Sequence, residues 1–171
     1  MLFRSKYGVS LAVEHLVARG RKNIYYIKDR DTDSAKSKRD GFLEAMRRNG
    51  LEFADHVLEA GETLASGIET VQALLAQGVV PDGIVCGEDL TAAGALKALL
   101  RAGLRVPGQV AVVGFNNSDY AHLCEPVLTS VDNKPEQVAL LCVQLLESSI
   151  ERSEAYSSVV LQPELAQGET S

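Results

Sequence analysis

The stretch from 82 to 120 constrains the fold more than any other part of the sequence. Two short, almost wholly apolar runs, 83–86 and 110–115, have the length of buried strands. Between them, apolar residues recur at helical spacing from 89 to 102, and Gly103 ends the pattern. Two such strands joined by a helix indicate parallel neighbours that are buried on both faces. The stretch therefore predicts an α/β fold.

A polar pair follows each of these two strands. Glu88 and Asp89 come after the first strand, and Asn116 and Asn117 come after the second. The carboxyl ends of parallel strands meet at one edge of a sheet, where open α/β sheets bind ligands. Helix capping is an equally plausible role for Asp89, and turn formation is the favoured role for Asn117. The sequence thus predicts a polar edge with Asn116 as a candidate contact.

Strands and helices alternate through the central part of the chain. Strands are expected near 25, 56, 84 and 112, and helices at 34–49, 66–77 and 89–102. Right-handed crossovers would arrange them as a four-stranded parallel sheet with helices on both faces. Ser66 and Glu69 fit a capping box at the start of the second helix. Farther along, 126–131 is expected to be extended and 158–161 to form an edge strand.

Two helical patterns, 7–19 and 135–150, lie outside this alternation. The second has one apolar face, made of Val138, Leu141, Cys142, Leu145 and Leu146. Burying such side chains contributes ~1.5–3 kcal/mol each. The sum is comparable with the ~5–15 kcal/mol stability of a whole domain. Both helices are therefore expected to pack on a second lobe that this chain mostly lacks.

Composition excludes several classes of protein. The hydrophobic content of 46% can fill a core, yet no apolar run approaches the ~20 residues of a membrane span. A net charge of −6 argues against this segment wrapping a phosphate backbone. The cysteines, Cys86, Cys124 and Cys142, form no CxxC pair or zinc spacing. We expect a cytoplasmic protein with no metal site and no membrane contact.

Catalysis has little support in the sequence. His15, His56 and His122 are isolated, and Ser130 has no glycine elbow beside it. No glycine-rich loop suited to a phosphate is present, and no pair of carboxylates has an acid–base context. The sequence therefore predicts a non-enzyme with no catalytic residues and no cofactor.

The first residues look unlike the start of an α/β domain. Residues 1–5 directly adjoin a helical pattern, and no strand precedes it. We expect residues 1–5 to be foreign and the natural gene to continue upstream.

The longest runs resemble a known family. PDGIVCGEDLTAAGALKALLRAGLRVPGQVAVVGFNNSD, PVLTSVDN and LQPEL occur in the order found in the effector-binding core of the LacI/GalR transcriptional repressors, and the resemblance spans about residues 7–165. It implies a periplasmic-binding-protein-like type I fold, with two α/β lobes, three crossovers and a ligand in the cleft. This chain would be mostly the carboxyl-terminal lobe.

The resemblance also implies a division of the chain. We expect 6–20 to be a helix of the otherwise missing amino-terminal lobe and 21–131 to be the carboxyl-terminal lobe. Residues 132–152 would return to the amino-terminal lobe, and 153–171 would form a closing strand and tail. The family's helix-turn-helix domain is missing.

Ligand-binding candidates carry over by position. Arg39 matches a family arginine that reaches a sugar hydroxyl or an effector anion; the alternative is a solvated arginine. Glu88 replaces a family asparagine, so a donor–acceptor amide becomes an acceptor-only carboxylate. Asp89 follows it as in the family. Asn116 stands where a family aspartate contacts ligand. Asn133 matches the last hinge crossing, and a polar turn is equally plausible there.

Three functional classes remain open. The first is the effector-sensing and dimerisation core of a LacI-type regulator. Its partners would be a sugar or a related molecule, a second copy facing helix 89–102, and operator DNA through the missing domain alone. The second is the sugar-binding protein of an ABC importer, which an upstream signal peptide would indicate. The third, a flavodoxin-like domain, lacks a cofactor loop. With half the cleft absent, weak or no sugar binding is expected.

Overall fold

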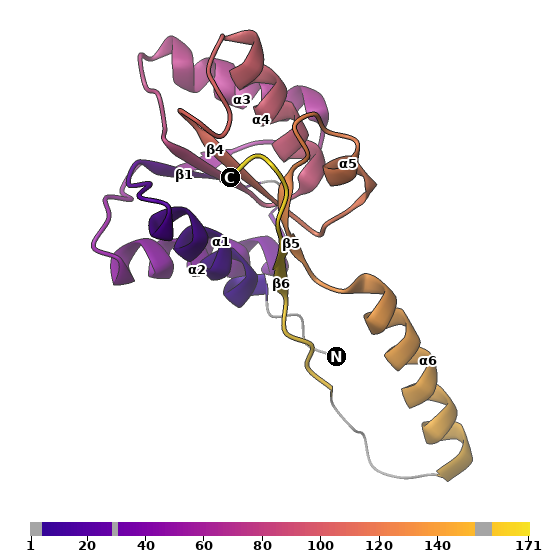
Figure 1. The fold of residues 1–171 in the computed structure, drawn as a ribbon. Coiled ribbons are helices and arrows are strands. Elements are labelled where there is room, and N and C mark those ends of the chain that lie inside the picture. The colour runs from indigo at the N-terminus through magenta and orange to yellow at the C-terminus, as the bar shows by residue number, and fades with distance from the viewer. Residues whose placement is uncertain (1–4, 29–30, 153–158) are drawn as a thin grey trace.

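A six-stranded sheet forms the centre of the computed structural model, which describes residues 5–28, 31–152 and 159–171 (Figure 1). The strand order is β2-β1-β3-β4-β5-β6, with the first five strands parallel and β6 antiparallel to β5. The α/β class with a mostly parallel sheet is confirmed. The sheet is wider than expected because the 126–131 segment and the tail add strands to the predicted four.

The bounds of the strands follow the apolar runs of the sequence. They are β1 (Ile24–Lys28), β2 (Val57–Glu59), β3 (Gly83–Cys86), β4 (Ala111–Phe115), β5 (Thr129–Asp132) and β6 (Glu164–Ala166). Every residue of β1, β3 and β4 is buried, because helices cover both faces of these central strands.

The edge strand does not lie where it was predicted. Ser158 falls outside the described residues, and 159–161 have no strand conformation. β6 begins at Glu164 instead, where Leu165 pairs with Val131 of β5. Three residues suffice for this edge strand, and so short a run carries no clear alternating pattern in the sequence.

Two helices cover each face of the sheet (Figure 1). α1 (Ser5–Ala18) and α2 (Asp33–Arg48) pack on one face, and α3 (Leu64–Ala76) and α4 (Asp89–Arg101) pack on the other. The short α5 (Asp119–His122) follows β4. Each pair of helices encloses its own apolar core against the strands.

The position of α1 corrects the expected division of the chain. We expected residues 6–20 to belong to the missing amino-terminal lobe. Instead, Val9, Ala12, Val13 and Leu16 are fully buried in the core that α1 shares with α2, β4 and β5. A sheet that extends to β5 needs a second helix on this face, and α1 provides it. The carboxyl-terminal lobe therefore includes α1.

α6 (Pro135–Arg152) extends away from the rest of the chain (Figure 1). Its exposed apolar residues are Leu140, Val143, Leu146 and Ile150, each more than half exposed. Val138, Leu141 and Leu145 of the expected apolar face are half-buried. The helix thus lies outside the layers of the sheet, as its sequence pattern indicated. Its assignment to an amino-terminal lobe stays a prediction.

The helices end at glycines, whereas the capping box predicted for α3 does not lie where it was expected. Gly20, Gly50, Gly78 and Gly103 all have positive φ just after a helix, and the helix end predicted at Gly103 is confirmed. The capping box of α3 consists of Thr63 and Ser66, so the predicted Ser66–Glu69 box is wrong by one turn. Among the described residues, no helix is both long and apolar enough for a membrane span.

Candidate functional site

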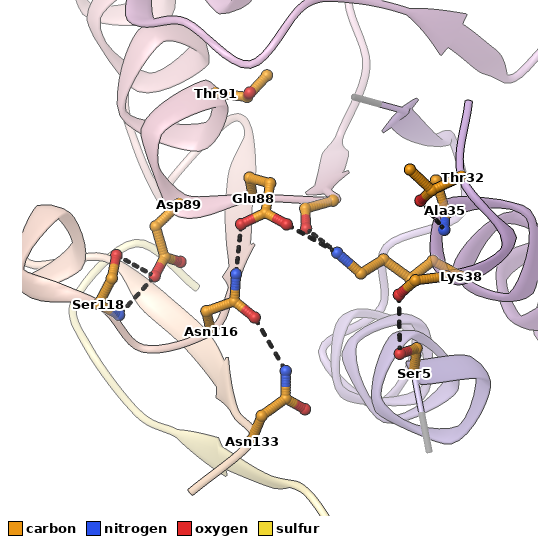
Figure 2. A network of polar contacts seen from close by, with 12 residues as sticks. Ser5, Thr32, Ala35, Lys38, Glu88, Asp89, Thr91, Asn116, Ser118 and Asn133 are labelled. Carbon is orange, nitrogen blue, oxygen red and sulfur yellow. Dashed lines mark hydrogen bonds and ion pairs between the residues drawn. The ribbon is translucent and has the colours of Figure 1, made fainter. Parts of the chain in front are cut away.

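The turns after β3 and β4 lie side by side at the carboxyl edge of the sheet (Figure 2). The two strands are parallel neighbours, so both chains leave the sheet at the same edge. Asn116 Nδ2 donates a hydrogen bond to Glu88 Oε2. Two residues 28 positions apart in sequence therefore meet, as the alternation of strands and helices predicted.

Asn133, which follows β5, extends this contact to a third strand end. Its Nδ2 donates to Asn116 Oδ1 at 2.9 Å (Figure 2). The turn that presents Asn116 is tight: φ is 100° at Asn116 and 51° at Asn117. Asparagine is among the few residue types that populate positive φ readily. The same conformation places the Asn117 N–H 3.0 Å from Ser130 Oγ, which fits the turn role favoured for Asn117.

Lys38 of α2 completes the arrangement, and the sequence reasoning missed it. Its Nζ donates to the Gly87 carbonyl at 2.6 Å and to Glu88 Oε1 at 3.0 Å. The ammonium also lies 4.3 Å from the ring centroid of Phe115, a cation–π distance. Lys38 is 5% exposed. We name Lys38, Glu88, Asn116 and Asn133 the edge network.

One sequence signal could have identified Lys38. The buried residues of α2 include Ala35, Lys38, Phe42 and Ala45, whose spacing of three and four places them on one helical face. A lysine within an apolar stripe is rare unless a partner neutralises it. Its position on the buried stripe thus distinguished Lys38 from its charged neighbours.

Arg39, the predicted cationic contact, lies beside the edge network without joining it. Its side chain is 45% exposed and pairs with Asp40 at 3.3 Å. It is close enough to Lys28 for its charge to oppose protonation there. A ligand contact by Arg39 stays a prediction.

Asp89 lies behind the edge rather than on it. It is 1% exposed. Its Oδ2 accepts from the Ser118 N–H at 2.7 Å and from Ser118 Oγ at 2.8 Å, and its Oδ1 accepts from Ser130 Oγ at 2.6 Å. The carboxylate therefore ties the turn after β4, through the Ser118 contacts drawn in Figure 2, to Ser130 of β5. Asp89 makes no side-chain cap to its helix, and Glu88 is the N-cap residue of α4.

Burial raises the pKa of Asp89 above its ordinary value, against the hydrogen bonds from Ser130 and Ser118, which favour the charged form. The site leaves no room for a larger neighbour, since a Cβ on Gly114 would lie 2.2 Å from Asp89 Oδ1. This environment indicates that Asp89 supports the edge network structurally.

A second buried lysine lies near the carboxyl edge. Lys28, the last residue of β1, contacts Glu59 at 3.0 Å and Asp31 at 3.7 Å. The hydrogen bond with Glu59 raises the pKa of Lys28. Both buried lysines of this edge are therefore neutralised by carboxylates.

The edge network can hydrogen-bond a polar molecule. Amide groups of Asn116 and Asn133 both donate and accept, and the Glu88 carboxylate accepts. In the part of the chain that the structure describes, no three His, Cys, Asp or Glu side chains gather in a way that could hold a metal ion.

Comparison with known proteins connects this geometry to a family. Residues 13–171 match the family model described as "Periplasmic binding protein-like domain". The HTH-type transcriptional repressor PurR of Pasteurella multocida is 32% identical over 161 residues, which are 92% of this chain and 48% of that protein. The chain thus spans about half the length of the curated relatives it matches.

Solved structures agree with the match. A sugar-binding transcriptional regulator of the LacI family from Escherichia coli, complexed with phosphate, superposes with a TM-score of 0.89 at 25% identity, over 99% of this chain and 62% of that one. A dimeric Lac repressor with an 11-residue carboxyl-terminal deletion gives 0.92 at 25% identity, over 98% and 62%. The chain therefore belongs to the periplasmic binding protein-like domain family, in the effector-binding form that LacI-type transcription regulators carry.

Proposed function

We propose that this chain is the effector-sensing part of a LacI-type transcription regulator. In this proposal, the edge network forms one wall of a cleft for a sugar or a related small polar molecule. One observation carries the proposal: side chains from three adjacent strand ends join in a single hydrogen-bonded series at the edge where α/β sheets bind ligands. The relatives are transcription regulators rather than enzymes.

Each member of the edge network has a proposed role. Asn116 and Asn133 hydrogen-bond ligand hydroxyls, and Glu88 accepts from them. Lys38 holds Glu88 in place, since its buried ammonium reaches Oε1. Asp89 and Arg39 are proposed as supporting and peripheral residues. A domain outside this chain binds operator DNA, and we infer a cytoplasmic location because transcription takes place there.

A second copy of the chain is the proposed protein partner, and it contacts the outer face of α4 and α5. A groove of about 550 Å3 lies there, and its apolar lining includes Leu96, Leu100, Tyr120 and Leu123. Leu123 is 80% exposed. Arg101 and Glu125 also line this groove, and a twofold axis that passes between them would place each opposite the other's copy in the second chain.

Ligand titration followed by amide NMR tests the sensing role. Neutral hexoses at millimolar concentration should shift the amides of Glu88, Asn116 and Asn133, with weak affinity because this chain forms one wall of the cleft. Asn133→Ala should weaken the binding at least tenfold. Gln72→Ala, an exposed change on α3, serves as the control and should leave the affinity unchanged. Shifts confined to other surfaces would contradict the proposal.

A further inference from the structure

The two buried lysines at the carboxyl edge point into the protein. Lys38 is 6% exposed in its side chain, and its ammonium donates to Gly87 and Glu88. Lys28 is 9% exposed in its side chain and contacts Glu59 and Asp31. Neither ammonium is presented to a molecule that approaches the edge.

The negative charge, in contrast, is partly accessible. Glu88 is 29% exposed in its side chain, and Asn116 and Asn133 are partly exposed beside it. The edge network thus offers a ligand one carboxylate and two neutral amides (Figure 2). A carboxylate accepts hydrogen bonds from hydroxyl and amino groups, and it repels a second anion in a partly desolvated site.

We propose that this edge selects ligands that present hydroxyl or amino groups and no negative charge. Glu88 is the selecting residue, and Lys38 is a positioning residue that holds it. The inference rests on the proposed sensing function and adds a ligand class to it: neutral or amino-substituted polyols, in preference to sugar acids and sugar phosphates.

Matched sugars test the selection on the full 171-residue chain. Glucose, galactose and mannose are titrated beside their uronic acids, and the amide shifts of the edge network give the dissociation constants. Each uronate should bind at least tenfold more weakly than its parent sugar. Glucosamine should bind at least as tightly as glucose. This comparison needs no variant, so it stands even if a substituted protein fails to fold.

Variants identify the residue responsible. Glu88→Gln removes the carboxylate charge that repels an anion, so the ratio of the uronate and parent-sugar dissociation constants should fall at least tenfold. Glu69→Gln removes the same charge from an exposed site on α3 and should leave the ratio unchanged. Lys38→Met should alter this ratio of dissociation constants, whereas Lys38→Arg should keep the ratio of the original chain. A loss of stability alone would not give this difference between the two variants.

Two outcomes overturn the inference in distinguishable ways. A uronate or glucose 6-phosphate that binds as tightly as the parent sugar refutes the charge selection and leaves the sensing role intact. If no compound shifts the amides of the edge network, both proposals fail.

Discussion

The ammonium of Lys38 lies 3.0 Å from Oε1 of Glu88, although 50 positions separate the two residues in sequence. The contact joins α2, which covers one face of the sheet, to the turn that begins α4 on the other face. It therefore fixes the acceptor group of the candidate site to the framework of the lobe.

Removing this contact should cost stability. Lys38→Met removes the ammonium that contacts the Glu88 carboxylate, and we expect a loss of about 1–3 kcal/mol in the free energy of unfolding by urea. The partial exposure of Glu88 keeps the loss below that of a fully buried pair. Lys36→Met on the exposed side of the same helix should change the free energy by less than about 0.5 kcal/mol. Equal losses in the two variants would contradict the role given to Lys38.

Ser130→Ala should destabilise the protein in a pH-dependent way. Ser130 donates to the buried Asp89 carboxyl group, and its loss should cost about 1.5–3 kcal/mol when that group is charged, because this hydrogen bond favours the charged form. The raised pKa of Asp89 gives a contribution to stability that is present below its ordinary pKa and is lost as pH rises through the folded value. The deficit of the variant should therefore shrink on acidification. Ser149→Ala, on the exposed side of α6, is the control.

His15 should make the protein less stable in mild acid. Burial first, and the charge of Arg19 second, lower the pKa of His15 to about 4. Arg19 donates to Nδ1 of His15, so Nε2 carries the ring hydrogen. Nε2 then donates to Ser171 Oγ, which lies 2.8 Å away. Since the unfolded chain takes up this proton first, the stability is complete above the ordinary histidine pKa and falls as pH drops toward 4.

Melting temperatures between pH 7 and pH 5 measure this effect. His15→Gln should lose less stability over this range than the original chain, whereas His122→Gln, at an exposed position, should follow the original chain. If the melting temperature of His15→Gln falls with pH as steeply as that of the original chain, the role given to His15 is wrong.

Gly94 permits the close approach of α3 and α4. A Cβ at this position would lie 2.2 Å from the Leu64 carbonyl oxygen. Gly94→Ala must separate the helices, so we expect a loss of about 1–3 kcal/mol in the free energy of unfolding. Gly108→Ala adds the same methyl group on an exposed loop, where the nearest atom is 3.4 Å away, and it should be nearly neutral. A neutral Gly94 variant would show that the helices shift freely.

Leu123→Asp should weaken self-association. The side chain is 80% exposed in the groove of α4 and α5, so folding is not at risk. If a second copy covers this groove, the dissociation constant from sedimentation should rise at least tenfold, or about 1.4 kcal/mol. Leu146→Asp, on the projecting α6, tests the alternative. Association that depends on Leu146 and not on Leu123 would place the interface on α6.

The sequence predicted the parallel sheet because its signals are local. Each apolar run of β1, β3 and β4 is short and bounded by polar residues, and the helices between them end at glycines with positive φ. Adjacent strand ends then follow from right-handed crossovers, which is why Glu88 and Asn116 were expected to meet.

Other features depend on contacts between distant segments. β6 has only three residues, and its pairing with β5 gives it strand form. The apolar stripe of α1 does not by itself identify the surface that it packs on. The structure shows that this surface is the sheet of this lobe, which is wide enough to need a second helix on that face. The partners of Lys38 likewise depend on the packing that brings Gly87 and Glu88 against α2.

By itself, then, the sequence determined the α/β class, the parallel pairing of β3 with β4 and the edge where polar side chains gather, because hydrophobic spacing and turn residues act over a few positions. The tertiary structure alone decided which groups Lys38 contacts, that Asp89 supports the edge network from behind, and that α1 belongs to this lobe. Those outcomes depend on which buried charge finds a partner and which face of the sheet remains to be covered. Both are settled only when the whole chain packs.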